Sequence, residues 1–486
     1  MSFSRRSFLR WTAAVSASSL ADRAGARVFA DGASGFQPNL LPTQKEVWDQ
    51  QVWMAKLGPK YTGNKAHTAF VDFLATEFEK AGCDVVRDRY TLPRWDARRR
   101  EISIAPSSGD RFKAPVTSYF PYSGQTAASG VTGPLAFAGN NPKFALGDLQ
   151  GKVALVEFAT ATREWSRVYA PWGVHPASES FPGAYRPARG AINDLAQFRK
   201  AGAVAVILAW TDVSDAKAAD QYTPFSRPPQ GIPGLYVGRD TGARLKALAA
   251  AGATATVVLE ADVFPDTPTD TVIATLPGAS ADEVVIVNTH TDGPNATEEN
   301  GALGILALAK YFARLPKASR RRALVFPLTT GHFAGPWVPS IRGVIEKHAD
   351  VIARAVAAVT VEHLGCREWM DDAAMRYGAT GKNEWSVAIT PDKPMADALV
   401  EALQGSRDRA AVVNPVNGGW LGEGSALSRA GVPTIGYIPQ PNYLLAGRPD
   451  GCIDKLSAEL MHSQVQVFAK LIHAIDRTAR RARATP

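Results

Sequence analysis

The sequence predicts an α/β protein built on a doubly wound, mostly parallel sheet with helices on both faces. Between residues 266 and 476, short apolar runs of strand length alternate with segments of helical periodicity, which is typical of such a sheet. Residues 116–265 differ, because short β-like runs are separated there by long loops rich in Gly and Pro. This contrast predicts a smaller α/β domain inserted into the first.

The composition is that of an ordinary globular protein. The chain has 486 residues, of which 45% are hydrophobic and 21% charged, and this excludes wholesale disorder, collagen and a coiled coil. No run of about 18 apolar residues is found, so no transmembrane helix is expected. Cys83, Cys366 and Cys452 are too few for a disulfide scaffold and lack thiolate zinc spacing, so we expect them to be small buried side chains.

Half of the net charge of +8 comes from the first thirty residues, which carry five arginines and one aspartate. The paired Arg5 and Arg6, the Phe8-Leu9 pair and the apolar stretch 11–21 resemble a twin-arginine export signal. A signal peptide over residues 1–30 predicts export of the folded protein to the periplasm or the medium, with no membrane association after cleavage. A basic disordered N-terminus is the alternative. The net charge that remains is too small to indicate a nucleic-acid partner. The short basic run at 98–100 is expected to lie in a solvated loop.

The expected elements follow in chain order. Residues 40–115 contain helices at 48–57 and 66–81 and a strand at 85–90. In the inserted region we expect strands at 131–137, 152–158, 203–209, 235–237 and 255–259, helices at 192–201 and 241–251, and a long surface loop at 169–191. The last region predicts strands at 284–290, 322–328, 356–362 and 433–438, and helices at 302–315, 349–355, 394–403 and 458–475.

Three of the eight histidines lie at or shortly after the ends of predicted strands. They are His290, His332 and His363, and Asp292, Glu299 and Glu362 accompany two of them. Strand ends of one open α/β sheet are neighbours in space and form its ligand site, and imidazole with carboxylate suits zinc or a similar ion. A single histidine at such a place more often satisfies a local hydrogen bond, but three favour a metal or catalytic site.

The stretch from Val284 to Asp292, followed by Glu299-Asn300-Gly301, resembles the co-catalytic zinc aminopeptidases, the group that includes aminopeptidase Y and glutamate carboxypeptidase. The segments 58–63 and 430–433 also resemble that family, and 147–156 resembles the protease-associated insert that many members carry. The likeness extends over about residues 42–475. It implies a zinc exopeptidase-like catalytic domain made of 40–115 and 266–476, with a protease-associated domain at 116–265.

The resemblance assigns four residues of the metal centre. It makes His290 a metal ligand, Asp292 the residue that orients it, Glu299 a carboxylate bridging two metals, and Glu362 an acidic ligand. Two features depart from the family. Gly331-His332 stands where the family has a pair of glutamates, the first of which is the general base, and no histidine occurs around 442–446, where the last ligand is expected.

The histidines and carboxylates that remain at the strand ends still predict a metal centre. A site for one metal ion can be formed by His290, Glu299, His332 and either Glu362 or His363. The expected cofactor is zinc or another divalent metal, and the number of ions, one or two, is left open. In that site Glu298 or Glu423 replaces the missing base.

The predicted function is therefore that of an exported metal-dependent hydrolase that cleaves peptide or amide bonds of small substrates. The alternative is a non-catalytic binding protein that keeps the peptidase fold. The sequence contains no Gly-x-Ser-x-Gly elbow, phosphate loop or dinucleotide motif. The substrate and the oligomeric state are left open.

Overall fold

The structure, a computed structural model, describes residues 35–478 except 161–162, 186–191 and 417–419. The predicted export signal at 1–30 lies outside these residues. In the described part of the chain, no helix combines the length and the apolar character needed to cross a bilayer.

The main sheet confirms the predicted fold class. Its central strands run in the order β12 (Thr254–Leu276), β14 (Arg322–Thr329), β13 (Ser280–His290), β15 (Ala355–Val361), β20 (Thr434–Tyr437), β18 (Ser386–Ile389), β19 (Ala410–Pro415) and β8 (Tyr169–His175). Strands β14, β13, β15 and β20 are parallel neighbours. These four strands are almost entirely buried, as expected for parallel strands covered on both faces.

Helices cover both faces of this sheet. One face packs against α2 (Gln44–Lys56), α3 (Lys65–Lys80), α7 (Gly301–Arg314), α10 (Lys393–Ala402) and α12 (Ala458–Arg477). The other packs against α8 (Ile341–Lys347), α9 (Ala349–Arg354) and α11 (Gly424–Arg429). Along β13, Val285 and Val287 enter the first core while Val284 and Ile286 enter the second, which is the two-residue alternation of a strand.

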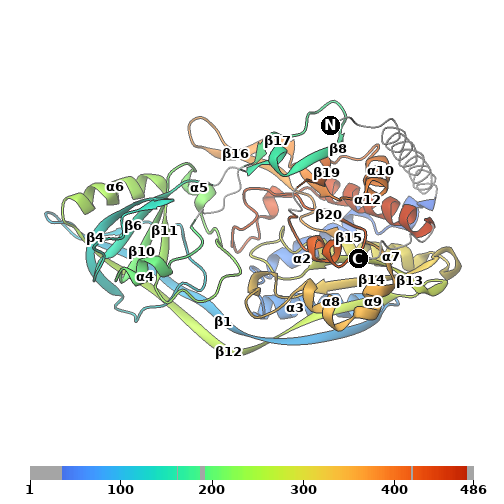
Figure 1. The fold of residues 1–486 in the computed structure, drawn as a ribbon, viewed down its shortest axis with the longest axis horizontal. Helices are drawn as coiled ribbons and strands as arrows, with labels where there is room; N and C mark the ends of the chain where they lie inside the picture. Colours follow the sequence, from blue (N-terminus) through green and yellow to red (C-terminus); the bar gives the residue numbers. More distant parts are fainter. Residues whose placement is uncertain (1–34, 161–162, 186–191, 417–419, 479–486) are drawn as a thin grey trace, which may run out of the picture.

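A second lobe lies beside the main one (Figure 1). It contains the parallel strands β4 (Val131–Asn140), β6 (Val153–Phe158), β10 (Ala205–Trp210) and β11 (Gly234–Val237), with α4 (Ala196–Lys200) and α6 (Arg239–Ala250). Shorter elements complete the two lobes: β2 (Phe112–Ala114), β3 (Ser118–Tyr119), β5 (Lys143–Phe144), β7 (Arg163–Glu164), β9 (Ala184–Tyr185), α5 (Asp215–Ala218), and the hairpin of β16 (Arg367–Asp371) and β17 (Tyr377–Asn383).

A long antiparallel ribbon joins the lobes. Strand β1 (Asp84–Ala105) pairs with β12 from Asp84↔Thr275 to Ala105↔Thr254, and Figure 1 shows the ribbon running from one lobe to the other. The predicted strands at 85–90 and 255–259 are thus only parts of much longer ones. The basic run at 98–100 lies inside β1, not in a loop, where Arg98 and Arg99 both pair with Glu260 across the ribbon.

The prediction of a surface loop over 169–191 is wrong in its first part. Tyr169–His175 form β8, which pairs antiparallel with β19 at the edge of the main sheet. The stretch of Pro, Gly and aromatic residues concealed this strand, because an edge strand tolerates Pro where its N–H is not needed by the ladder.

Candidate metal centre

The carboxyl ends of three neighbouring parallel strands bring the predicted histidines together. His290 is the last residue of β13, His332 follows β14, and Glu362 and His363 directly follow β15. Because β13 lies between the other two strands, its end is flanked by theirs. The side chains of His290, Glu362 and His363 are buried, whereas His332 retains 19% exposure.

Each of the three imidazoles is held through its Nδ1 atom by an oxygen. His290 Nδ1 lies 2.9 Å from the carbonyl of Asp292, His363 Nδ1 lies 2.6 Å from the carbonyl of Pro439, and His332 Nδ1 lies 2.7 Å from Glu423 Oε1. A carbonyl or carboxylate oxygen can only accept, so Nδ1 carries the proton in every case. When such a ring is neutral, it presents an unprotonated Nε2, which is how structural partners prepare a histidine as a metal ligand.

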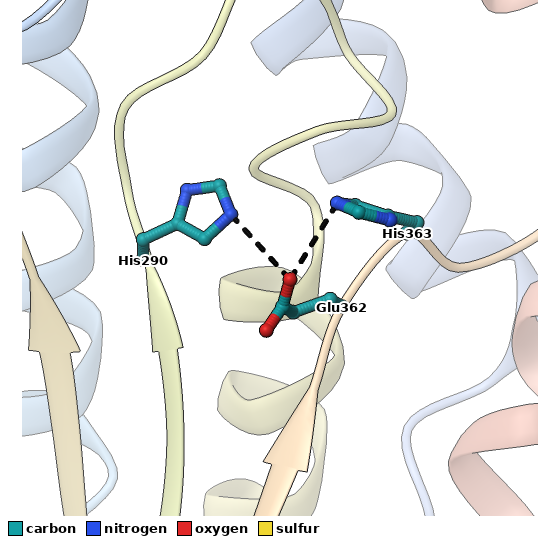
Figure 2. A group of neighbouring side chains, drawn as sticks. All are labelled: His290, Glu362 and His363. Carbon is teal, nitrogen blue, oxygen red and sulfur yellow. Dashed lines mark ion pairs between the residues drawn. The ribbon is translucent and has the colours of Figure 1, made fainter. Parts of the chain in front are cut away.

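The first candidate ligand group consists of His290, Glu362 and His363 (Figure 2). Glu362 Oε2 lies between the rings, 3.8 Å from His290 Nε2 and 3.7 Å from His363 Nε2. Among the described residues, none of these three buried atoms completes a hydrogen bond. Buried acceptors that face one another at such distances are costly unless a cation or proton lies between them. A tetrahedral divalent ion such as zinc fits this donor set.

Glu298 gives a second group with His290 and His332, and it shares His290 with the first. Glu298 Oε2 lies 3.2 Å from His363 Nε2. Burial opposes ionisation of Glu298, but the charge of His363 outweighs it and the pKa of Glu298 is lowered. Burial likewise lowers the pKa of His363, but the Glu298 charge prevails and the pKa is raised. A positive group is thus favoured here, as an imidazolium or as a metal ion.

Glu299 lies in neither ligand group. Its Oε1 is 2.7 Å from Lys60 Nζ, and both side chains are fully buried. Burial raises the pKa of Glu299 to about 7, although the Lys60 ammonium acts in the opposite direction. The sequence motif around 58–63 was recognised, but nothing in it marked Lys60 as a partner of the acidic loop.

The carboxylate of Asp292 also has partners other than His290. It accepts hydrogen bonds from Thr62 Oγ1 at 2.6 Å, from the His332 N–H at 3.2 Å and from the Phe333 N–H at 2.9 Å. Asp292 therefore meets His290 through its backbone carbonyl, and its side chain fixes the turn that carries His332.

Glu423 directly precedes α11, and its carboxylate accepts hydrogen bonds from several donors. Besides His332, it accepts from Ser340 Oγ at 2.9 Å and the Ile341 N–H at 3.2 Å. Burial raises its pKa, but the hydrogen bond and charge of His332 outweigh this and lower it to about 2. Reciprocally, burial lowers the pKa of His332, whereas Glu423 raises it to about 9. These contacts suit Glu423 to orienting His332 rather than taking a proton from substrate.

Gly331 precedes His332 in a left-handed conformation, with φ +93°. A Cβ atom added there would lie 2.4 Å from Val338 Cγ1. The backbone at this position thus excludes a glutamate as long as Val338 packs against it.

Two asparagines hold the loops around the centre: Asn300, which belongs to the acidic motif, and Asn295, which the sequence did not single out. Asn300 accepts from the Leu364 N–H and donates to the Leu364 carbonyl, which ties the turn after His363 to the start of α7. Asn295 Nδ2 contacts the carbonyls of Tyr443, Leu444 and Ala446. The segment that lacks the expected histidine is therefore anchored next to the acidic loop.

Side chains of the smaller lobe pack against the residues around His332. Phe225 stacks on Phe333, with ring centroids 4.6 Å apart, and lies 5.4 Å from the His332 ring. Ser226 Oγ accepts from the Gly335 N–H at 2.9 Å. A cavity of about 220 Å³ reaches His332, Ser340 and Glu423. His332 is thus the part of the centre that a small molecule can approach.

Comparison with solved structures places this fold among metallopeptidases. No family model and no curated protein sequence matches the chain. A crystal structure of a peptidase M28 precursor from Shewanella amazonensis has a TM-score of 0.67 at 17% identity, covering 96% of this chain and 99% of that chain. The zinc aminopeptidase BSAP from Bacillus subtilis has a TM-score of 0.61 at 16% identity, with coverages of 89% and 95%.

A third structure, the aminopeptidase from Aneurinibacillus sp. strain AM-1, has a TM-score of 0.56 at 17% identity, covering 88% of this chain and 93% of that chain. The chain therefore has the fold of M28 peptidases and zinc aminopeptidases. Similarity at this level of identity establishes the architecture, and the chemistry has to be argued from the side chains.

Proposed function

We propose that this protein is a metal-dependent hydrolase that cleaves peptide or amide bonds. The observation that carries the proposal is the common arrangement of three histidines, each held at Nδ1 by an oxygen acceptor and each presenting Nε2 toward buried carboxylates. A protein that merely buried these rings would gain nothing from leaving ligand atoms without partners. The shared fold with zinc aminopeptidases supports the same conclusion.

In this proposal His290, Glu362 and His363 hold the ion, and zinc is the metal that their N and O atoms suit best. The bound ion would supply Lewis acidity toward a carbonyl and toward water. The chain's own residues do the rest. Asp292 and Pro439 fix the two ligand rings through their carbonyls, and Phe333 and Phe225 limit the entry of water.

Glu298 is the proposed general base. Its carboxylate lies beside His363 and belongs to the second ligand group, and its Oε2 completes no hydrogen bond among the described residues. Glu423, the other candidate in the sequence, is committed to His332, Ser340 and Ile341. A base must be free to take a proton near the reacting atom, and Glu298 meets this condition better.

A binding protein without catalysis is the second candidate, and Gly331 favours it. No carboxylate stands at this position, and the contact with Val338 leaves no room for one. In that case the same pocket would bind a metal or a peptide end without turning it over.

Activity measurements separate the two candidates. The full chain is assayed against a panel of aminoacyl and peptidyl amides with added zinc, cobalt or manganese, after removal of metal with a chelator. We expect hydrolysis that is lost on chelation and that falls ~10²–10⁴-fold in Glu298→Gln. His348→Gln, which alters a histidine paired with Asp88 outside the centre, is the matched control. Metal binding without hydrolysis of any amide would support the binding protein.

We further propose that the smaller lobe is a protease-associated domain and that the protein is exported through its twin-arginine signal. The export proposal is tested by replacing Arg5 and Arg6 with Lys and measuring the protein in the periplasm. We expect the double variant to stay inside the cell, and normal export would contradict the proposal.

A further inference from the structure

The two candidate ligand groups cannot be filled at the same time. Both include His290, whose Nδ1 is held by the Asp292 carbonyl, so that Nε2 is left as its ligand atom. An imidazole nitrogen has one lone pair for one metal ion. A second ion would therefore need a carboxylate to replace His290. Glu299 is the acidic residue next to Glu298 in the same loop, and its placement decides whether such a carboxylate is present.

Glu299 already has a cation. The Lys60 ammonium lies 2.7 Å from Glu299 Oε1, 2.8 Å from the Gly58 carbonyl and 3.3 Å from the Met54 carbonyl. An ammonium has three N–H donors, and three oxygens surround this one. Both side chains of the ion pair are fully buried, so water does not compete for either charge.

Lys60 is also fixed in place by its backbone. Its N–H donates to the Gly293 carbonyl at 2.8 Å, and its own carbonyl accepts from the Gly293 N–H at 3.0 Å. Gly293 in turn lies against the acidic loop, since a Cβ there would come within 2.5 Å of Glu299 Oε2. The segment that carries Lys60 is thus paired with the loop that carries Glu298 and Glu299.

We infer that the centre holds a single divalent ion per chain and that Lys60 neutralises Glu299 where a second ion would otherwise do so. Lys60 is then a positioning residue, because its ammonium lies 2.7 Å from Glu299 Oε1 and holds that side chain outside both ligand groups. Breaking a buried pair by removing one partner is strongly destabilising, so the two residues act as a unit. This inference rests on the proposed metal-dependent function.

Metal stoichiometry tests the inference without an activity assay. The metal-free protein is titrated with cobalt, followed by visible absorption, and with zinc against a chromophoric chelator. We expect a break at one equivalent. Lys60→Met combined with Glu299→Gln removes both charges while keeping similar volumes, and we expect it to bind one equivalent with a Kd within about tenfold of the unchanged protein. Glu362→Gln is expected to weaken binding by at least about 100-fold.

The matched control removes a different ion pair, with Lys310→Met and Glu77→Gln on two packed helices. Two tight equivalents in the unchanged protein would overturn the inference while leaving the proposed function intact. Loss of the metal in the Lys60/Glu299 double variant, with its fold preserved by circular dichroism, would also overturn it, because Glu299 would then be a ligand. No bound metal at all would overturn both.

Discussion

The imidazole rings of His290 and His332 are stacked, with centroids 4.1 Å apart and planes inclined by 14°. Two rings in such contact cannot both be positively charged without strong repulsion. Burial lowers the pKa of His290, and the positive charge of His332 lowers it further. Because Glu423 raises the pKa of His332, the positive charge of the pair lies on His332. His290 then stays neutral, as a metal ligand must be.

Removing the Glu423 charge is expected to reverse this assignment. In metal-free Glu423→Gln, the pKa of His332 should fall from about 9 by at least about one unit, because the hydrogen bond and charge of Glu423 no longer oppose burial and only the weaker effects of Glu298 and Glu362 still raise it. NMR titration of the histidine ring protons measures this change. Ser340→Ala removes a neutral partner of Glu423 and serves as control. An unchanged titration of His332 in Glu423→Gln would contradict the assignment.

Metal binding should stabilise the fold. A ligand that binds only the folded chain at 1,000 times its Kd contributes about 4 kcal/mol, which corresponds to several degrees in Tm for a protein of this size. We expect zinc to raise Tm and a chelator to abolish the increase. In Glu362→Gln the increase should be largely lost, whereas His348→Gln should keep it. A Tm indifferent to zinc would count against the metal centre.

Acid is expected to weaken the fold through His67. Its Nδ1 accepts from the Gly63 N–H and its Nε2 donates to Thr291 Oγ1, so the ring is held neutral. Burial lowers its pKa from 6.5 to about 4. The unfolded chain therefore binds this proton first as the pH falls. The free energy of unfolding should decrease between pH 6.5 and 4, by up to about 3 kcal/mol from this residue.

Denaturant unfolding at a series of pH values measures this dependence. His67→Gln should flatten the profile by the contribution of one proton, and part of the slope should remain because burial also lowers the pKa of His473 to about 4. An identical slope in His67→Gln would show that His67 is not responsible.

Gly331→Ala is expected to destabilise the protein by about 2–5 kcal/mol. The left-handed backbone costs about 1–2 kcal/mol for a residue with a Cβ, and the overlap with Val338 adds about 1–3 kcal/mol. Val338→Gly in the same chain removes both Cγ1 and Cβ, which lie 2.4 and 2.5 Å from the added atom. It should therefore recover part of the overlap cost, which a double-mutant cycle of unfolding free energies would detect. Gly147, where a Cβ meets nothing within 4 Å, provides the control. Additive effects of the two changes would rule out the contact.

The part of the centre that depends on the sheet could be predicted, and the part that depends on loops could not. His290, His332 and His363 converge because parallel strands place their carboxyl ends at one edge, and an apolar run followed by a histidine is visible in a sequence. The pairing of Lys60 with Glu299 depends on how two distant loops meet at Gly293, and no local pattern encodes that.

The full length of the two ribbon strands could not be predicted for a different reason. Strands β1 and β12 are partly exposed along much of their length between the lobes, so their sequences lack the two-residue alternation by which a half-buried strand is recognised. Their charged residues instead satisfy one another across the ribbon, as Arg98 and Arg99 do with Glu260.

The same ribbon dictates an order of assembly. In a chain made from its amino terminus, β1 is complete at Ala105, but its partner β12 begins only at Thr254. During that interval β1 has an open edge, and the strands of the smaller lobe are synthesised and can fold as a unit. The carboxyl half of β12 lies beside β14, and the strands that carry the histidines all follow β12 in the chain, so they are synthesised only after both strands of the ribbon.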